Sequence, residues 1–433
     1  MIFLSVGLLI ILIAFSNFKK GFYYFLFYKV CLVTNITVIS VPGIPLLTLD
    51  LFMTMVFIAL YYKDRKKLNN EIIPFPYKKP FIFISVSYFL STIFAYVGFQ
   101  SAFSQYIGQV VGEFLFAWLM WKVVDKKDIG YIIKGLSFMF FLSCIYAFFE
   151  KVTQTNPIQA YEMTLVQDSS RVIDFLVTDD ANRGYRVQSF FEHAIGAGID
   201  WCMYIILFFS LVIEYKYKPK SKFTLVTAIL CIPCVFFANA RGPIVFLLIG
   251  VLCFVDLKNK NFYKALIVGF ILLLIFSPLF SDYTDNILSI FNQKAQNRVG
   301  GSNAEMRFEQ LGAAFALMMK SPFVGLGYKF MNELNDPLVN MLLGLESMWF
   351  RILTQFGLLG VISNFVLAYY SLVKIPKQYK SKPIFFFSLA YWVTGSLTSL
   401  PGMLMYLYYL ILIIFIKQSD IYDVKSKRIV TKK

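Results

Sequence analysis

The stretch FTLVTAILCIPCVFFANARGPIVFLLIGVLCFV, Phe223 to Val255, contains a single charged side chain, that of Arg241. Lys222 precedes the stretch and Asp256 follows it, and both are expected on the cytoplasmic side of a membrane. Within Asn239 to Pro243, a glycine and a proline provide the residues that a turn requires. The stretch therefore predicts two membrane helices joined by a tight turn, with Arg241 at the outer mouth of the turn, near the lipid headgroups.

The composition of the whole chain agrees with a membrane protein. Of its 433 residues, 58% are hydrophobic, 18% are aromatic and only 15% are charged. A soluble protein could not cover so much apolar surface, because about 20 mostly apolar residues already cross a bilayer. The spans must be helices, since a membrane barrel would show alternating segments of about ten residues. We expect an all-α, polytopic membrane protein, with residues 1–433 forming a single integral membrane domain.

The basic residues indicate the topology. The formal net charge is +16, and the lysines lie in short clusters on alternate loops between apolar runs. The positive-inside rule places such clusters in the cytoplasm, so the charge is explained without a nucleic-acid partner. The first apolar run has no basic segment before it and no clear cleavage site, so it is interpreted as a retained helix. The N-terminus is then outside, the C-terminus inside, and about 13 spans are expected, near 2–18, 21–37, 45–62, 81–98, 105–123, 129–149, 191–214, 222–239, 242–257, 264–281, 346–373, 383–400 and 402–417.

Two long loops are expected on the outer face, at 150–190 and 281–345. In the second loop, Ser302 to Glu305 fits a capping box, and apolar residues follow at helical spacing. We expect an amphipathic helix at about 303–320, lying on the membrane or covering a cavity.

Arginines and lysines have different distributions. Seven of the nine arginines fall in the outer loops or at the outer ends of helices, where the positive-inside rule does not explain them. A guanidinium offers paired donors that match phosphate and carboxylate oxygens. Arg241 alone is also explained by a side chain that reaches lipid phosphates. Together with Arg186 and Arg307, it predicts a site for an anionic substrate.

Three stretches resemble the O-antigen polymerase and O-antigen ligase superfamily of bacterial surface polysaccharide assembly. NARGPIVFLLIGVL is similar to the family's arginine-glycine hairpin. MRFEQLGAAFALMMKSPFVGLGYKF is similar to its loop helix, which is followed by a Pro-x-x-Gly-x-Gly turn. ESMWFRILTQFGLLG is similar to the end of its last loop, and RVQSFFEHAIGAG gives a weaker match. The resemblance covers roughly Arg186 to Gly360.

The resemblance implies a glycosyltransferase-C-like membrane enzyme in the cytoplasmic (inner) membrane of a bacterium, with its active site facing outside. It would be a polymerase that joins oligosaccharide repeat units carried on undecaprenyl pyrophosphate, for O-antigen, capsule or exopolysaccharide. Membrane lipids, a flippase and a chain-length regulator are the implied partners. Family members are not thought to need a metal, and no cofactor is expected.

The resemblance also suggests roles for individual residues. Arg186, Arg241 and Arg307 would hold the pyrophosphate leaving group, where charge develops as the glycosidic bond breaks. Glu346 stands where the family's ligases usually carry a histidine, and it is our candidate general base for the acceptor hydroxyl. It could also be an ordinary carboxylate at a helix start. Trp349 could stack on a sugar ring, and Arg351 either pairs with Glu346 or faces the cavity.

The histidine and the cysteines of the chain are interpreted as structural residues. The only histidine, His193, is interpreted as a structural residue at a helix start. All six cysteines fall inside predicted spans, and Cys231 and Cys234 favour packing over metal or redox chemistry. Two other functions remain open, an O-antigen ligase and a flippase or transporter of lipid-linked oligosaccharides.

Overall fold

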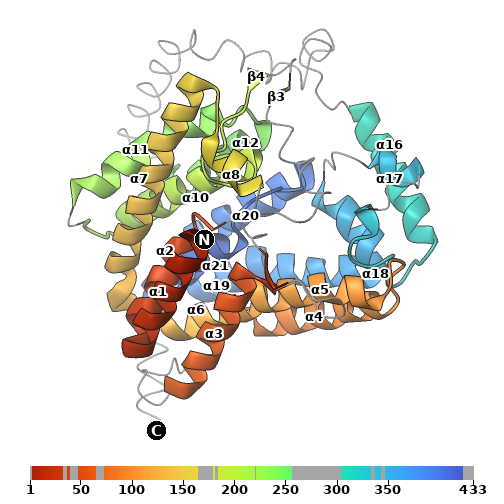
Figure 1. Ribbon diagram of the computed structural model, residues 1–433, viewed down its shortest axis with the longest axis horizontal. Coiled ribbons are helices and arrows are strands. Elements are labelled where there is room, and N and C mark those ends of the chain that lie inside the picture. The colour runs from red at the N-terminus through yellow and green to blue at the C-terminus, as the bar shows by residue number, and fades with distance from the viewer. Residues whose placement is uncertain are drawn as a thin grey trace.

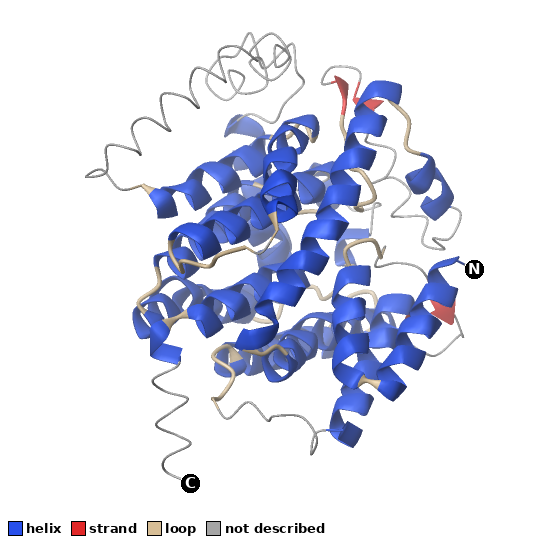
Figure 2. Cartoon of the chain, turned by 90° about the vertical axis from the view of Figure 1, so that its left-hand side faces the viewer, coloured by secondary structure: helices blue, strands red, loops and turns tan. Residues whose placement is uncertain are grey.

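A computed structural model describes residues 2–32, 37–39, 47–64, 73–163, 179–180, 184–219, 221–255, 304–332, 337–342 and 347–422. Helices dominate these residues, as Figures 1 and 2 show. Their strands form two short antiparallel pairs, β1 (Thr37–Ile39) with β2 (Leu47–Thr48), and β3 (Asp179–Asp180) with β4 (Gly184–Tyr185). The expected all-α class is confirmed for this part of the chain.

The helices follow one another along the chain with short connections wherever both ends of a connection are described. They are α1 (Ile2–Ser16), α2 (Phe18–Tyr28), α3 (Leu49–Asp64), α4 (Lys78–Ile93), α5 (Phe99–Gln109), η1 (Val110–Leu115), α6 (Phe116–Val123), η2 (Lys126–Asp128), α7 (Ile129–Thr153), α8 (Pro157–Met163), α10 (Ala194–Ile213), α11 (Lys222–Phe237), α12 (Arg241–Val251), η3 (Leu252–Phe254), α16 (Ala304–Met319), η5 (Phe330–Asn332), α17 (Pro337–Met341), α18 (Met348–Tyr369), η6 (Tyr370–Lys374), α19 (Ile375–Tyr379), α20 (Lys382–Leu397) and α21 (Met405–Gln418).

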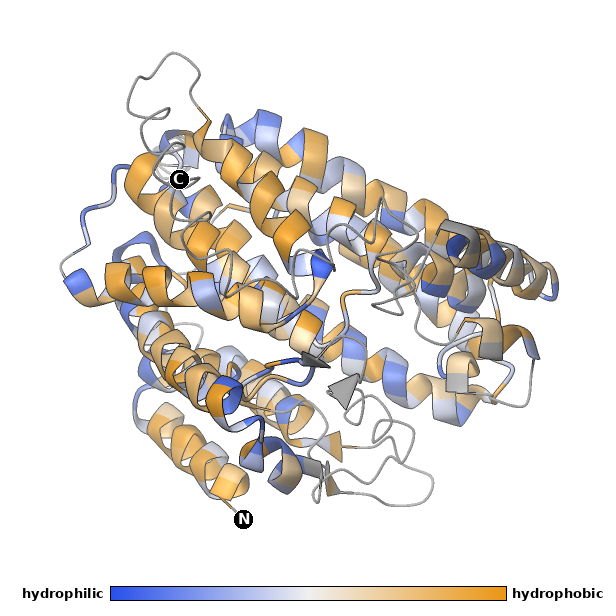
Figure 3. Cartoon of the chain, turned by 90° about the horizontal axis from the view of Figure 1, so that it is seen from above, coloured by the Kyte–Doolittle hydropathy of each residue, from blue (hydrophilic) through white to orange (hydrophobic). Residues whose placement is uncertain are grey.

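Hydrophobic residues cover most of the helices (Figure 3). Among the described residues, three helical stretches are long and apolar enough to cross a membrane, Lys126–Thr153, Ala194–Ile213 and Met348–Tyr379. Four shorter apolar helices accompany them. These helices support a membrane protein, whereas the number of 13 spans stays a prediction. The predicted span at 264–281 lies outside the described residues, and the division into one membrane domain with two outer loops is also still a prediction.

Helix α10 lies at the centre of the packing. It contacts α11, α12 and α21, and most of its length is buried. Small residues permit this close approach, because a Cβ at Gly198 would lie 2.5 Å from Pro243 Cγ of α12. Helix α12 in turn packs on α20. The predicted turn between the two apolar runs is present: α11 ends at Phe237, Asn239 has a positive φ of 44°, and α12 begins at Arg241.

The second helix is shorter than the predicted 21–37. Helix α2 ends at Tyr28, and the next residue, Lys29, forms a buried ion pair with Asp50 in the first turn of α3. Beyond α2, the chain forms β1 and pairs with β2 just before α3. A buried charge needs a nearby partner, and Asp50 is brought within reach of Lys29 by this return of the chain.

Candidate functional site

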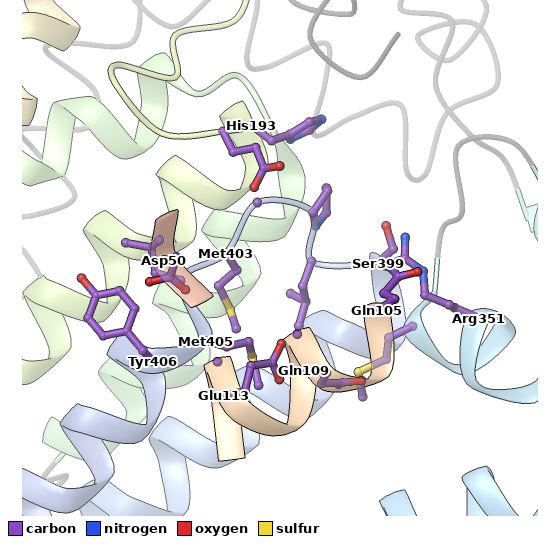
Figure 4. Close-up of a pocket in the computed structure, with 18 of the residues that line it drawn as sticks. Asp50, Gln105, Gln109, Glu113, His193, Arg351, Ser399, Met403, Met405 and Tyr406 are labelled. Atoms are coloured by element: carbon purple, nitrogen blue, oxygen red, sulfur yellow. The ribbon is translucent and has the colours of Figure 1, made fainter. Parts of the chain in front are cut away.

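A cavity of about 700 Å³ lies where the N-terminal helices meet the C-terminal ones (Figure 4). It has charged side chains of both signs on its walls, contributed by segments far apart in the sequence. They are Lys29, Asp50, Glu113, Glu192, Lys329 and Arg351, and His193 also lines the cavity. A polar cavity of this size inside an apolar helical protein has room for a polar ligand such as one or two sugar rings.

Two glycine motifs that are separate in the sequence pack together behind Tyr328, Gln355 and Phe356, which line the cavity. The backbone N–H groups of Leu326 and Gly327 donate to the carbonyl oxygens of Thr354 and Gln355, each at 2.9 Å. In the opposite direction, the N–H groups of Leu358 and Leu359 donate to Pro322 and Phe323 at 2.9 and 3.0 Å. The Pro-x-x-Gly-x-Gly turn is thus hydrogen-bonded along a break in α18.

The break occurs at Gly357, whose φ of 58° and ψ of −157° are not helical. Such a conformation is essentially restricted to glycine. A broken helix leaves carbonyl and N–H groups unpaired, which is costly in a membrane protein. The turn satisfies these groups, and Ser91 Oγ of α4 adds a further hydrogen bond of 2.6 Å to the Gln355 carbonyl. The two glycine motifs therefore stabilise each other.

The same turn directs Tyr328 toward the cavity. The Tyr328 hydroxyl donates to the side-chain oxygen of Gln109 at the end of α5. Its ring packs edge-on against Phe356, with ring centroids 4.8 Å apart, and Phe356 stacks on Tyr88 at 3.6 Å. Asn364 Nδ2 donates to the Tyr88 hydroxyl at 2.8 Å. These contacts fix the orientation of two tyrosine rings at the cavity wall.

Several predicted residues lie around the C-terminal end of α20. Arg307 of α16 donates to the Leu397 carbonyl at 3.4 Å. Trp349 Nε1 donates to Ser396 Oγ at 2.8 Å. Gly242, which follows Arg241, packs so closely that a Cβ there would lie 3.0 Å from Thr398 Cγ2.

The loop after α20, from Ser399 to Leu404, lines the cavity. The predicted residues around the end of α20 are therefore beside the cavity, and among the predicted site residues that the structure describes only Arg351 lines it.

Arg186 lies close to the turn between α11 and α12, which leads to Arg241. Val187, the next residue, donates its N–H to the Phe237 carbonyl at 3.0 Å, just before the α11–α12 turn. The segment after Arg186 is held by Glu150 of α7, whose carboxylate accepts from the N–H groups of Gln188 and Ser189 at 3.2 and 2.6 Å. Arg186 itself is buried, with 7% of its surface exposed. The structure thus brings Arg186 and Arg241 to neighbouring backbone segments.

Residues 226–365 match the O-antigen ligase family. This match, about a third of the chain, includes the hairpin at Arg241, helix α16, the glycine turn and most of α18. It confirms the resemblance to the O-antigen polymerase and ligase superfamily. A search of curated proteins found no match. The chain is accordingly similar to membrane enzymes of the O-antigen pathways, and the family implies lipid-linked oligosaccharide substrates.

Glu346, the predicted general base, lies outside the described residues. The described chain resumes at Ser347, which caps α18 by accepting from the Trp349 N–H at 3.2 Å. Met348 follows and lines the cavity. The start of α18 is therefore beside the cavity, while the role of Glu346 stays a prediction.

His193 caps a helix and also lines the cavity. Its Nδ1 accepts from the Ile195 N–H at 3.0 Å and so caps α10. The residue also lines the cavity (Figure 4), as does Glu192, which precedes it in the sequence. Gly402 of the α20–α21 loop packs against it, since a Cβ there would lie 2.7 Å from His193 Cβ. The helix cap agrees with the structural role predicted for His193.

The polar face of α5 and η1 was not predicted from the sequence. Gln105, Gln109 and Glu113 line the cavity at intervals of four residues, with Gly108 and Gly112 on the same face. This spacing places side chains on one side of a helix. The regular polar spacing within an otherwise apolar span is the signal that could have found them.

The two cysteines for which packing was predicted lie inside the helical bundle. Cys231 and Cys234 are buried, and Cys231 Sγ lies 3.6 Å from Cys144 Sγ of α7. Among the described residues, no group of three or more histidine, cysteine, aspartate or glutamate side chains is arranged to hold a metal ion.

Proposed function

We propose that this chain is a polysaccharide polymerase that joins repeat units carried on undecaprenyl pyrophosphate, on the outer face of the cytoplasmic membrane of a bacterium. The donor is the growing polysaccharide on its lipid pyrophosphate, and the acceptor is a lipid-linked repeat unit. The polymer is an O-antigen, a capsule or an exopolysaccharide. A flippase that delivers repeat units and a chain-length regulator are the expected partners.

One observation carries the proposal. Arg307, Trp349 and the Arg241 turn meet around the end of α20, beside a cavity with carboxylates and amides on its walls. Guanidinium groups suit a pyrophosphate, which carries negative charge on several oxygens. Carboxylates and amides suit the hydroxyls of sugars. A substrate with an anionic lipid end and a hydroxyl-rich end fits these two neighbouring regions.

The reaction follows from this division. The acceptor oxygen forms a bond to the anomeric carbon of the donor sugar, and the bond from that carbon to the pyrophosphate oxygen breaks. The electron pair leaves with the pyrophosphate, whose developing charge Arg241, Arg307 and Arg186 stabilise. Glu346 takes the proton of the acceptor hydroxyl. No cofactor takes part in this scheme.

An O-antigen ligase is the second candidate, because the matching family model is described as O-antigen ligase. A ligase would transfer a finished polymer to a different acceptor. Glu346 favours the polymerase, since ligases of this superfamily usually carry a histidine at the corresponding position. The two functions differ in the acceptor and share the chemistry at the pyrophosphate.

The substitution Glu346→Gln distinguishes them in cells. Glutamine keeps the size of the side chain and cannot take the proton, so extension should fall by roughly 10² to 10⁴-fold. Single lipid-linked repeat units should accumulate, while a separate ligase still transfers one unit to the final acceptor. Loss of that transfer as well would favour the ligase. Polymer of wild-type length, measured by gel electrophoresis beside the control Glu214→Gln, would contradict a catalytic role for Glu346.

A further inference from the structure

The cavity wall formed by α5 and η1 is unusual for a predicted membrane helix. Its side chains at the cavity are Ser104, Gln105, Gly108, Gln109, Gly112 and Glu113. They recur on one face, and the remaining faces carry mainly aromatic and aliphatic residues. Polar and ionisable side chains inside a membrane span are energetically expensive and usually mark a functional path or site. This polar face requires an explanation beyond packing.

Glu113 lies in a π-helical turn, η1 (Val110–Leu115), in which the N–H of Phe116 donates to the Val111 carbonyl. Single π-turns within α-helices are often found at functional sites. Gln109, the last residue of α5, precedes this turn and lies four residues before Glu113. Gln109 and Glu113 therefore extend together into the cavity, as Figure 4 shows.

The two glutamines of this face differ in their hydrogen-bond partners. Gln109 accepts from the Tyr328 hydroxyl and hydrogen-bonds the Glu113 side chain, so its amide is oriented on both sides. Within the described residues, the buried Gln105 Oε1 has no hydrogen-bond partner. A buried oxygen without a donor is costly, and a hydroxyl group of a ligand in the cavity would supply one.

Lys29, a basic residue of the same cavity, is already paired with another carboxylate. Lys29 forms its ion pair with Asp50, and the two side chains are only 6% and 14% exposed. Its Nζ also lies 4.7 Å from the ring centroid of Phe116 and 5.2 Å from that of Tyr406. Among the described residues, no basic group forms an ion pair with Glu113. Its carboxyl group is hydrogen-bonded to Gln109 and lines the cavity, where a second polar partner can reach it.

We propose that Glu113, Gln109 and Gln105 form a subsite for a sugar ring of the lipid-linked repeat unit, with Tyr328 as its aromatic wall. The carboxylate and the amide oxygen accept from ring hydroxyls, and the tyrosine ring packs against the apolar part of the sugar. The inference rests on the proposed function, which supplies a lipid-linked sugar as substrate. It assigns binding to this subsite and leaves proton transfer to Glu346.

Binding of two lipids to the full-length protein in nanodiscs tests the subsite. One lipid is undecaprenyl pyrophosphate carrying the native repeat unit, and the other is the same lipid without sugar. Loss of a charged hydrogen bond should weaken binding of the sugar-bearing lipid by about tenfold to a hundredfold in Glu113→Gln. Binding of the sugarless lipid should be unchanged. Gln105→Leu serves as a second variant in case Glu113→Gln does not fold, because it leaves the hydrogen bonds among Tyr328, Gln109 and Glu113 intact. It should also weaken binding of the sugar-bearing lipid and leave binding of the sugarless lipid unchanged.

The outcomes separate the two proposals. If the wild-type protein prefers the sugar-bearing lipid and both variants keep that preference, the subsite is overturned while the proposed function stands. Equal weakening for both lipids also overturns it, because the loss then does not depend on the sugar. If the wild-type protein shows no preference for the sugar-bearing lipid, the subsite and the proposed function both fail. The exposed-site control Glu214→Gln should bind both lipids like the wild type.

Discussion

The N–H of Gly327 donates to the carbonyl oxygen of Gln355 at 2.9 Å, across the break that Gly357 introduces in α18. The bond joins two glycine motifs that are too far apart in the sequence to be paired by a turn or a hairpin. It also places Tyr328 and the start of the broken helix at the same cavity. The glycines of both motifs are thus part of one structural element, which forms a wall of the candidate site.

Gly357→Ala tests this element. Alanine rarely adopts the backbone angles of Gly357, and its Cβ would lie 2.6 Å from the Gly325 nitrogen and 2.7 Å from the Pro322 oxygen. We expect a destabilisation of about 1–3 kcal/mol from the backbone strain, with polymer synthesis reduced. Gly312→Ala is the matched control: it lies within α16, where an added Cβ meets nothing within 4 Å. Thermal unfolding of both variants in nanodiscs measures the difference, and equal melting temperatures would contradict the interpretation.

Parts of the fold followed from local sequence signals. The α11–α12 turn was predictable from an apolar run whose length allows two crossings, but Gly242 and Pro243 lie in the first turn of α12 and the chain reverses at Asn239. The early end of α2 was not predictable, because it depends on the distant partner Asp50 of Lys29. The pairing of the glycine turn with α18 also has no local signal, since it consists of long-range backbone hydrogen bonds.

The candidate site was predictable to a different extent. The arginines singled out from the sequence stay predictions, and the contacts of Arg307 and Gly242 with the end of α20 had no signal in the sequence. The polar face with Gln109 and Glu113 was missed, because a hydropathy average over a span conceals a few polar residues on one face. Glu346 lies outside the described residues, so its catalytic role depends on the resemblance and on experiment.

Arg241→Lys distinguishes substrate recognition from attachment to lipid headgroups. If Arg241 holds a pyrophosphate through two parallel hydrogen bonds, Arg241→Ala should abolish polymer at normal protein level. Lysine should restore activity only in part, because a single ammonium cannot form the paired contact. The measurement is polymer formation from lipid-linked repeats in membranes. Full activity with lysine would favour a side chain that merely reaches lipid phosphates.

The predicted topology can be tested by single cysteines at four loop positions. We expect Ser170→Cys and Ala295→Cys to react with a membrane-impermeant maleimide added to intact cells. Asn70→Cys and Gln378→Cys should react only after permeabilisation. Among the described residues, the native cysteines are buried except for Cys31, which is half-buried, so their background reaction should be low. Labelling of positions 70 and 378 in intact cells, with protection of 170 and 295, would place the arginines on the wrong side for the proposed reaction.

Glu162 of α8 gives a prediction about pH. Its side chain is 1% exposed, and its Oε1 has no hydrogen-bond partner within the described residues. Burial, and then the negative charge of Glu192 at the cavity, raise the pKa of Glu162 from 4.5 to about 8. Since the folded-state pKa lies above the unfolded value, folding favours the protonated acid. Its contribution to stability is fully present below about pH 4.5 and is lost as the pH rises through 8.

Glu162→Gln keeps the shape of the protonated acid and removes the titration. We expect the melting temperature of the wild-type protein in nanodiscs to fall between pH 5 and pH 8.5, and the variant to be more stable than the wild type by roughly 2 °C or more at the higher pH. At pH 5 the two should unfold at similar temperatures, because both then carry a neutral side chain at this position. Glu214→Gln, at an exposed glutamate, should follow the wild type across the range. A constant difference between Glu162→Gln and the wild type at both pH values would show that packing, and not the proton, determines the effect.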